Sequence, residues 1–398
     1  MPMKARRLIK RILIGVGALF VVLIVALGGL IAWQWTFINR IRHFPANPVT
    51  DVAWYTPKER VPGGDGTPLP RARPEEIRIA PEALKAVAKL ADAKNASALL
   101  VLHDDQVVLE EHWRGHRPGD PTNSMSMAKT IVSLLIGIAL EEGKIKSLDE
   151  PAATWLPAWR DDARRKITLR HLLQMHSGLQ AEGTDDDPLS DRVYLILGTN
   201  MRFVVDYIPA VAEPGTQFDY NNVNFQALGF ILEAATGKRY SEYLSEKLWK
   251  PIGAGEAAVW LDRENGSAHT GGFLFAKPED WAKVGLLLLH DGQWNGRQII
   301  SHEYLRQMIT PSPTEPRYGQ GIWLAHNPYQ AQQEDEQQFL ANGIFYLDGH
   351  SKQRVYVVPS QRLIVVRVGE NGRRWDEAAL CNTVLRGLLP RVKDEPAN

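Results

Sequence analysis

Hydrophobic and polar positions divide the chain into an apolar amino-terminal stretch and a longer region of mixed patterns. Residues 12–38 contain no charged side chain. The apolar part, residues 12–35, would form a helix about 36 Å long, enough to cross a hydrocarbon core of about 30 Å. Basic residues precede this stretch and outnumber those just after it: Lys4, Arg6, Arg7, Lys10 and Arg11 against Arg40 and Arg42.

The longer basic flank predicts the orientation of this segment. Positive flanks stay in the cytoplasm, so we expect a cytoplasmic basic tail over residues 1–11 and a single-pass transmembrane signal anchor over residues 12–38. The remainder would then lie on the periplasmic side of the inner membrane. A long signal peptide that is removed is the alternative, and it leads to the same compartment.

Residues 39–76 predict a linker, and residues 77–398 a folded domain. The stretch from 43 to 76 holds seven prolines and the run Gly63-Gly64-Asp65-Gly66. Proline and glycine oppose regular ladders and helices, so we expect an irregular tether, which can lie against the domain.

Strand-like runs lie near both ends of the folded region. A hairpin pattern covers residues 98–109, and a second covers residues 354–368. The chain between them reads mainly as helices separated by Gly- and Pro-rich loops, and a last helix is expected over residues 376–389. This order predicts an α+β fold, with an antiparallel sheet built from both ends of the domain, flanking helices and a large, mainly helical insertion.

Composition removes several classes of function. The 46 basic residues balance the 46 acidic ones, which argues against a nucleic-acid partner bound by overall charge. The single cysteine, Cys381, excludes an intramolecular disulfide framework and a cysteine-based zinc cluster. The sequence has no His-Glu-x-x-His, Gly-x-Ser-x-Gly, P-loop or dinucleotide fingerprint, and we expect no cofactor and no metal.

A serine and a lysine one helical turn apart form the first candidate for chemistry. Ser126-Met127-Ala128-Lys129 opens an almost continuous apolar run that ends at Gly143. Residues three apart on a helix share one face, so Ser126 and Lys129 can touch. A lysine in an apolar site has a lowered pKa and can take the proton of a serine hydroxyl. Alone, the pattern also fits a capping serine followed by a solvated lysine.

Tyr220-Asn221-Asn222 is the second candidate. A tyrosine beside a protonated lysine can have a lowered pKa and relay a proton, and the amide of Asn222 can hold a substrate carbonyl. The alternative is an ordinary loop tyrosine with a turn-forming pair of asparagines.

Together these motifs resemble the penicillin-recognising serine hydrolases: class C β-lactamases, DD-peptidases, and related esterases and 6-aminohexanoate-dimer hydrolases. The resemblance covers residues 96–370, is closest to the aminohexanoate-hydrolase branch, and extends to non-catalytic stretches such as residues 142–151, 167–179 and 291–296. It implies that Ser126 is the nucleophile, Lys129 its base and Tyr220 a proton relay.

The family's third motif is the point of departure. His269-Thr270-Gly271 has the letters of a His-Thr-Gly motif, but it leads into a helix and is interpreted as a decoy. Asp348-Gly349-His350-Ser351-Lys352-Gln353 resembles the Gly-x-x-Gly-Gln segment of the aminohexanoate-hydrolase branch, with Lys352 where a glycine is usual. The resemblance implies that Gly349 and His350 lie at the site and that the His350 backbone N–H binds the oxyanion. We also place Tyr194 in the substrate cleft.

The sequence thus predicts a membrane-anchored extracytoplasmic serine hydrolase that cleaves a small ester or amide through an acyl-enzyme on Ser126. A DD-peptidase or β-lactamase is the alternative enzyme, although the absence of Lys-Thr-Gly argues against binding of a β-lactam carboxylate. A sensor that captures a ligand on its serine without turnover is the alternative from another class.

Overall fold

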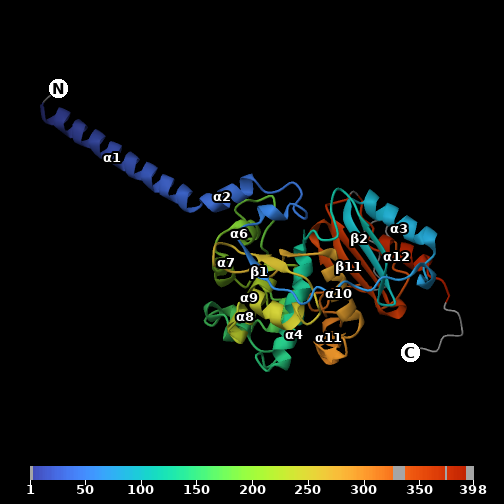
Figure 1. Cartoon of the computed structure of the whole chain (residues 1–398). Helices are drawn as coiled ribbons and strands as arrows, with labels where there is room; N and C mark the ends of the chain where they lie inside the picture. Colours follow the sequence, from blue (N-terminus) through green and yellow to red (C-terminus); the bar gives the residue numbers. More distant parts are fainter. Residues whose placement is uncertain (1–2, 326–336, 373, 391–398) are drawn as a thin grey trace.

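A computed structural model describes residues 3–325, 337–372 and 374–390 (Figure 1). Its described part holds a sheet of six antiparallel strands in the order β3-β2-β12-β11-β10-β9. The strands are β2 (Ala96–His103), β3 (Gln106–His112), β9 (Trp323–Leu324), β10 (Phe345–Gly349), β11 (Gln353–Val358) and β12 (Leu363–Gly369). Strands from both ends of the domain are therefore neighbours, which confirms the predicted sheet.

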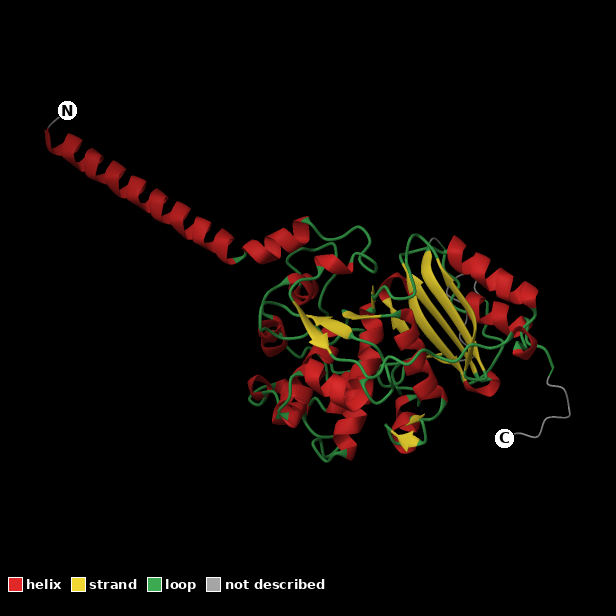
Figure 2. Ribbon diagram, viewed as in Figure 1, coloured by secondary structure: helices red, strands yellow, loops and turns green. Residues whose placement is uncertain are grey.

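Both faces of this sheet are covered (Figure 2). Helices α3 (Pro81–Ala93) and α12 (Ala379–Arg386) pack on one face, and α10 (Pro278–Leu289) packs on the other. Alternate residues of β2 enter the two cores, Leu100 and Leu102 on the α10 side and Leu99 and Val101 on the α3 side. Burial on both faces explains why this strand is apolar throughout instead of alternating.

The predicted helical insertion lies between β3 and β9, and confirms the α+β fold. Its other helices are α4 (Ala128–Glu141), α5 (Leu169–Leu173), α6 (Asp191–Leu197), α7 (Met201–Tyr207), α8 (Asn222–Thr236), α9 (Tyr240–Leu244) and α11 (His302–Met308). It also contains a two-stranded hairpin, β7 (Gln293–Trp294) and β8 (Arg297–Gln298). Helix α4 is buried on nearly all sides and packs against α8, so it anchors this half of the molecule.

The amino-terminal apolar stretch forms helix α1 (Met3–Trp33), which projects away from the domain (Figure 1). The window Ile12–Gly29 has a mean hydropathy of 2.8 and is fully exposed, so length and composition allow it to cross a membrane. The predicted span ran to residue 38, but the helix breaks at Gln34, and α2 (Trp35–Arg42) begins there. Residues 1–2 of the predicted tail and residues 391–398 of the predicted domain lie outside the described residues.

Residues 39–76, predicted as an irregular tether, contain regular structure and dock on the domain. Strand β1 (Lys58–Val61) pairs with β5 (Ala257–Trp260) in a second sheet, which β6 (Leu274–Ala276) and β4 (Thr122–Asn123) complete. Tyr55 and Val61 in this segment are fully buried. The prolines fall between these contacts, so they shape the path of the segment without preventing its docking.

Candidate active site

Ser126 lies in a short turn, Met125–Met127, directly before helix α4. The preceding residue, Met125, has a left-handed backbone with φ 48°, which is unfavourable for a residue with a side chain. The Oδ1 atom of Asn123 accepts a hydrogen bond from the Met125 N–H at 3.0 Å and holds this conformation. The neighbouring Ser124 pairs with Leu274 of β6. The Ser124 N–H donates to the Leu274 carbonyl oxygen at 2.9 Å, and the Leu274 N–H donates to Ser124 Oγ at 3.1 Å. The second sheet therefore fixes the position of the candidate nucleophile.

Lys129 brings the predicted pair together. Its Nζ lies 2.8 Å from Ser126 Oγ, 2.7 Å from Asn222 Oδ1 and 2.7 Å from the Gly271 carbonyl oxygen. The two amide oxygens can only accept hydrogen bonds, whereas the hydroxyl can donate. A neutral amine has two N–H donors for the two amide oxygens and one lone pair, which then faces the Ser126 hydroxyl. The arrangement therefore matches a lysine that accepts the serine proton.

The electrostatics of the site favour this neutral form. Lys129 is 2% exposed. Burial lowers the pKa of Lys129 to about 7, while the Glu182 carboxylate raises it and the Arg192 guanidinium lowers it further. A substantial fraction of the amine is thus unprotonated near neutral pH.

Tyr220 is at the site, but its titration differs from the expectation. Its ring centroid lies 5.1 Å from Lys129 Nζ, and its ring stacks on Trp323 at 5.9 Å. Burial raises the pKa of Tyr220, and its hydrogen bond with Ser126 opposes this only in part. The predicted lowering of the Tyr220 pKa required a protonated Lys129, whereas burial favours the neutral amine. The phenol is therefore neutral and hydrogen-bonds with Ser126.

Asn222 begins helix α8, and its amide is already engaged on both sides. Its Oδ1 accepts from Lys129, and its Nδ2 donates to Glu182 Oε1 at 2.5 Å. Its backbone N–H donates to Glu182 Oε2 at 3.0 Å. The side chain lines the pocket, as predicted, but these bonds make it a positioning residue for Lys129 more than a binder of a substrate carbonyl.

Gly349 and His350 lie beside the nucleophile turn. Strand β10 and the turn His350–Lys352 that follows it contact Met125–Met127. A Cβ at Gly349 would meet the Ser124 carbonyl oxygen at 2.4 Å, so only glycine permits this approach. His350 lines the same pocket as Ser126. The use of its N–H as an oxyanion donor stays a prediction.

Two predictions about other residues need correction. Gly271 of the supposed decoy accepts a bond from Lys129, and His269 lines the pocket, although this segment is not the third-motif strand. Tyr194 is not among the lining residues that the structure describes. Its ring packs against Phe37 at 5.3 Å and Phe203 at 6.4 Å, because it faces away from its pocket-lining neighbours on helix α6.

Glu182 and Arg192 are functional candidates that the sequence interpretation missed. Glu182 is 5% exposed and is paired with Arg192 at 2.7 Å, and Asp185 contacts Arg192 at 2.5 Å. They connect to Lys129 through Asn222. No sequence motif around Glu182 indicated this network, because the network depends on a contact between Glu182 and Asn222, which are 40 residues apart.

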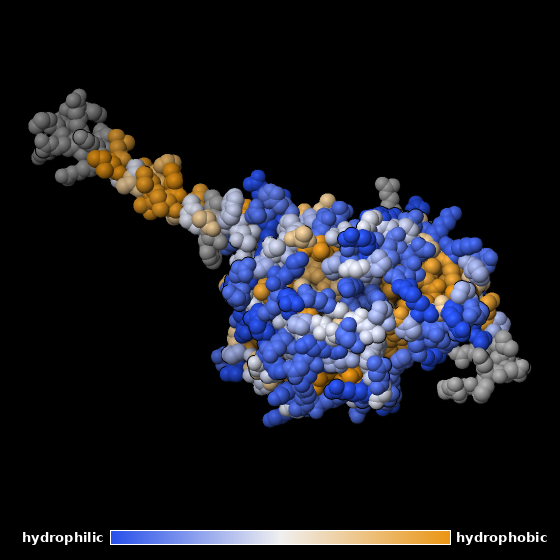
Figure 3. Space-filling model, in the orientation of Figure 1, coloured by the Kyte–Doolittle hydropathy of each residue, from blue (hydrophilic) through white to orange (hydrophobic). Residues whose placement is uncertain are grey.

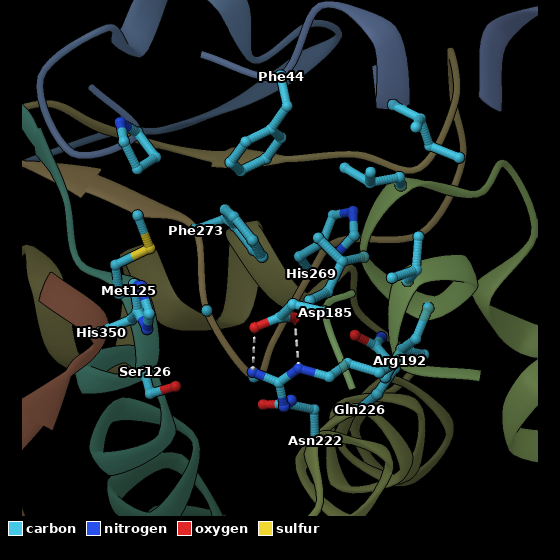
Figure 4. Close-up of a pocket in the computed structure, with 18 of the residues that line it drawn as sticks. Phe44, Met125, Ser126, Asp185, Arg192, Asn222, Gln226, His269, Phe273 and His350 are labelled. Carbon is cyan, nitrogen blue, oxygen red and sulfur yellow. Dashed lines mark hydrogen bonds and ion pairs between the residues drawn. The ribbon is translucent and has the colours of Figure 1, made fainter. Parts of the chain in front are cut away.

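A pocket of about 630 Å³ opens above these residues (Figure 4). Ser126 and Asn222 lie at one end, and Phe44 of the amino-terminal segment lies at the other. The remaining lining is largely apolar and includes Ile41, Pro48, Met125, Val193, Leu195, Ile196, Leu197 and Phe273.

The chain is similar to known hydrolases in sequence. A sequence model of the β-lactamase family matches residues 85–380. The 6-aminohexanoate-dimer hydrolase of Paenarthrobacter ureafaciens is 25% identical over 238 residues, which cover 57% of this chain and 60% of that hydrolase.

Solved structures share the fold. A Bacillus anthracis protein described as a candidate 6-aminohexanoate-dimer hydrolase has a TM-score of 0.70 and 22% identity, with 85% of this chain and 91% of that one covered. A family VIII carboxylesterase has a TM-score of 0.61 and 17% identity, with 78% and 99% covered. Because the family match spans most of the chain, this chain belongs to the β-lactamase family of serine hydrolases.

Proposed function

We propose that this chain cleaves an ester or amide bond through an acyl-enzyme on Ser126, with Lys129 as its base. The contact set of Lys129 carries the proposal, because two obligate acceptors occupy its N–H groups and leave the lone pair for the Ser126 hydroxyl. The similarity to hydrolases of amides and esters supports the choice of bond.

The proposed reaction has two halves. Ser126 Oγ attacks the carbonyl carbon as its proton passes to Lys129 Nζ, and the resulting alkoxide is stabilised by backbone N–H donors. Collapse breaks the bond to the leaving alcohol or amine, which takes up that proton with Tyr220 as relay. Water then attacks the acyl-enzyme, releases the carboxylic acid and restores the Ser126 hydroxyl.

We further propose that α1 anchors the enzyme in the inner membrane, with its catalytic domain on the periplasmic side. The exposed apolar window Ile12–Gly29 and the basic flank before it support this arrangement. Protease added to spheroplasts should degrade the domain, and alkaline carbonate should leave the chain in the membrane fraction. Protection from protease, or release by carbonate, would contradict the anchored topology.

An active-site serine probe tests the chemistry. A fluorophosphonate should label the wild type on Ser126; Ser126→Ala should abolish labelling, and Lys129→Met should slow it strongly. Ser133→Ala is the matched control, since Ser133 lies on the same helix and its hydroxyl makes no hydrogen bond within the described part of the chain. Persistent labelling of Ser126→Ala would reject the assignment.

A chromogenic cephalosporin separates the alternative enzyme classes. Steady hydrolysis would favour a β-lactamase, and a stable penicilloyl adduct would favour a DD-peptidase. We expect neither to match turnover of simple esters, because the standard Lys-Thr-Gly is missing from the third-motif position.

A further inference from the structure

The pocket has a polar catalytic end and an apolar wall, and the wall has no role in the proposed reaction. That wall is built from helix α6 and from the segment just after the apolar helix α1. Ile41, Phe44 and Pro48 supply the second part. Figure 4 shows Phe44 reaching from the amino-terminal segment toward Phe273, across the pocket from Ser126.

The charges around the pocket argue against an anionic substrate, since the lining includes the carboxylates of Asp185 and Asp186. Among the described lining residues, Arg192 is the only lysine or arginine. It is already paired with both Glu182 and Asp185. Burial lowers the pKa of His269 to about 3, so it is neutral at pH 7. Lys352 acts on the carboxylates of Asp348 and Glu377 and is not among the described lining residues. A substrate carboxylate would therefore meet no unpaired cation among the described lining side chains.

The apolar wall is tied to the base of α1. Arg40 of α2 is buried and donates to the carbonyl oxygens of Leu197 (3.1 Å), Gly198 (3.0 Å) and Thr56 (3.2 Å). Helix α2 is thus fixed to the end of α6, one of the elements that line the pocket. A single break at Gln34 separates α2 from α1, so the pocket lies close to where α1 meets the domain (Figure 1).

Exposed apolar side chains mark the same side of the domain. Aromatic rings form a row from α2 through α6 to α7: Phe37, Tyr194, Phe203 and Tyr207, each within 6.4 Å of the next. Tyr207 is 74% exposed, and Leu189, beside the pocket-lining Pro188, is 89% exposed. Tyrosine and tryptophan favour the membrane–water interface, so Tyr194 and Tyr207 suit this position. Figure 3 shows the apolar surface of α1 leading to a domain whose visible face is mostly hydrophilic, with smaller apolar areas elsewhere.

We propose that the substrate is a long-chain acyl ester or amide held at the membrane surface, with its acyl chain in the apolar pocket. This rests on the proposed function: Ser126 takes the acyl group, and the polar head leaves as an alcohol or amine. The volume of about 630 Å³ lies within the range of pockets that enclose small ligands. The chain passes Phe273 and ends against Phe44.

A chain-length series on the full chain in phosphatidylcholine nanodiscs tests this. The probes are p-nitrophenyl acetate, butyrate, octanoate and laurate. Full burial of one methylene is worth about a fourfold gain, and octanoate has four more methylenes than butyrate, so kcat/KM should rise by between about tenfold and about 250-fold. A flat or falling series would overturn the proposal.

The Phe44→Ser variant locates the effect in this pocket. It should lower the ratio of octanoate to acetate kcat/KM by about fivefold or more, since the end of the chain loses its apolar partner. Leu340→Ser is the control, because Leu340 is another exposed apolar residue (57%) and is not among the described lining residues. It should leave the ratio unchanged. An equal effect in both variants, with unfolding midpoints preserved, would contradict the assignment.

Fluorophosphonate labelling distinguishes failure of the long-chain substrate proposal from failure of the serine hydrolase assignment. Labelling of Ser126 combined with no chain-length dependence would reject the lipid-like substrate and leave the serine hydrolase standing. Absence of labelling together with absence of ester turnover would reject both.

Discussion

The catalytic end of the pocket and its amino-terminal wall are built in opposite ways. Ser126, Lys129 and Asn222 form a compact polar cluster joined by hydrogen bonds, in which burial favours the neutral form of Lys129. Ile41 of α2 and Phe44, which follows that helix, form an apolar surface. This difference indicates that one end of the pocket carries out the reaction while the other selects the substrate. Substitutions at the two ends should therefore have separable effects on catalytic rate and on chain-length preference.

The largest expected effect breaks the catalytic end alone. Lys129→Met should lower kcat/KM roughly 10³-fold for acetate and octanoate alike, because loss of a general base costs about 10²–10⁴-fold. Stopped-flow measurement of p-nitrophenol release provides the rates. Lys283→Met is the matched control, since Lys283 is also 2% exposed but bonds the Gly253 carbonyl. A loss confined to octanoate would contradict the division of labour.

A smaller effect sharpens how the catalytic end is tuned. The Glu182 carboxylate raises the pKa of Lys129, so Glu182→Gln should move the acid limb of the kcat/KM profile to lower pH. Activity at the pH optimum should fall about tenfold, because the Asn222 side-chain N–H would then bond to a neutral amide, which is a weaker acceptor than the carboxylate. A pH–rate profile on butyrate measures both changes. A shift toward higher pH would show that Glu182 does not act on the lysine by charge.

The smallest expected effect concerns the wall. Arg40→Met removes bonds to three carbonyl oxygens and should cost about 3 kcal/mol of unfolding free energy. Because α2 is then held less firmly, the octanoate-to-acetate ratio should fall about threefold while turnover of acetate changes less. Urea unfolding and the two ester assays measure this. Equal losses on both esters would indicate general destabilisation instead.

The same contrast explains what the sequence could predict. Ser126 lies in the turn that opens an apolar helix and Lys129 lies three residues later on that helix, so local geometry alone brings them together. The strands near residues 98 and 364 were predictable because burial on both faces leaves continuous apolar runs. Tyr220 and Gly349 were placed by resemblance, since nothing local links them to Ser126.

The missed features depend on contacts distant in sequence. The docking of residues 39–76 depends on β1 pairing with β5, about 200 residues away, and the proline pattern concealed it. The role of Gly271 depends on a backbone carbonyl, which any residue would supply. Tyr194 was misplaced because helix α6 turns its neighbours, and not its own ring, toward the pocket.

The pH dependence of Ser126 acylation tests the central claim most directly. With excess p-nitrophenyl butyrate, the pre-steady-state burst rate should rise with pH through a single inflection near 7, because Lys129 must lose its proton to accept that of Ser126. The residual acylation of Lys129→Met should lack that inflection. A burst rate that does not change between pH 5 and 9, or an inflection that survives in Lys129→Met, would contradict the account.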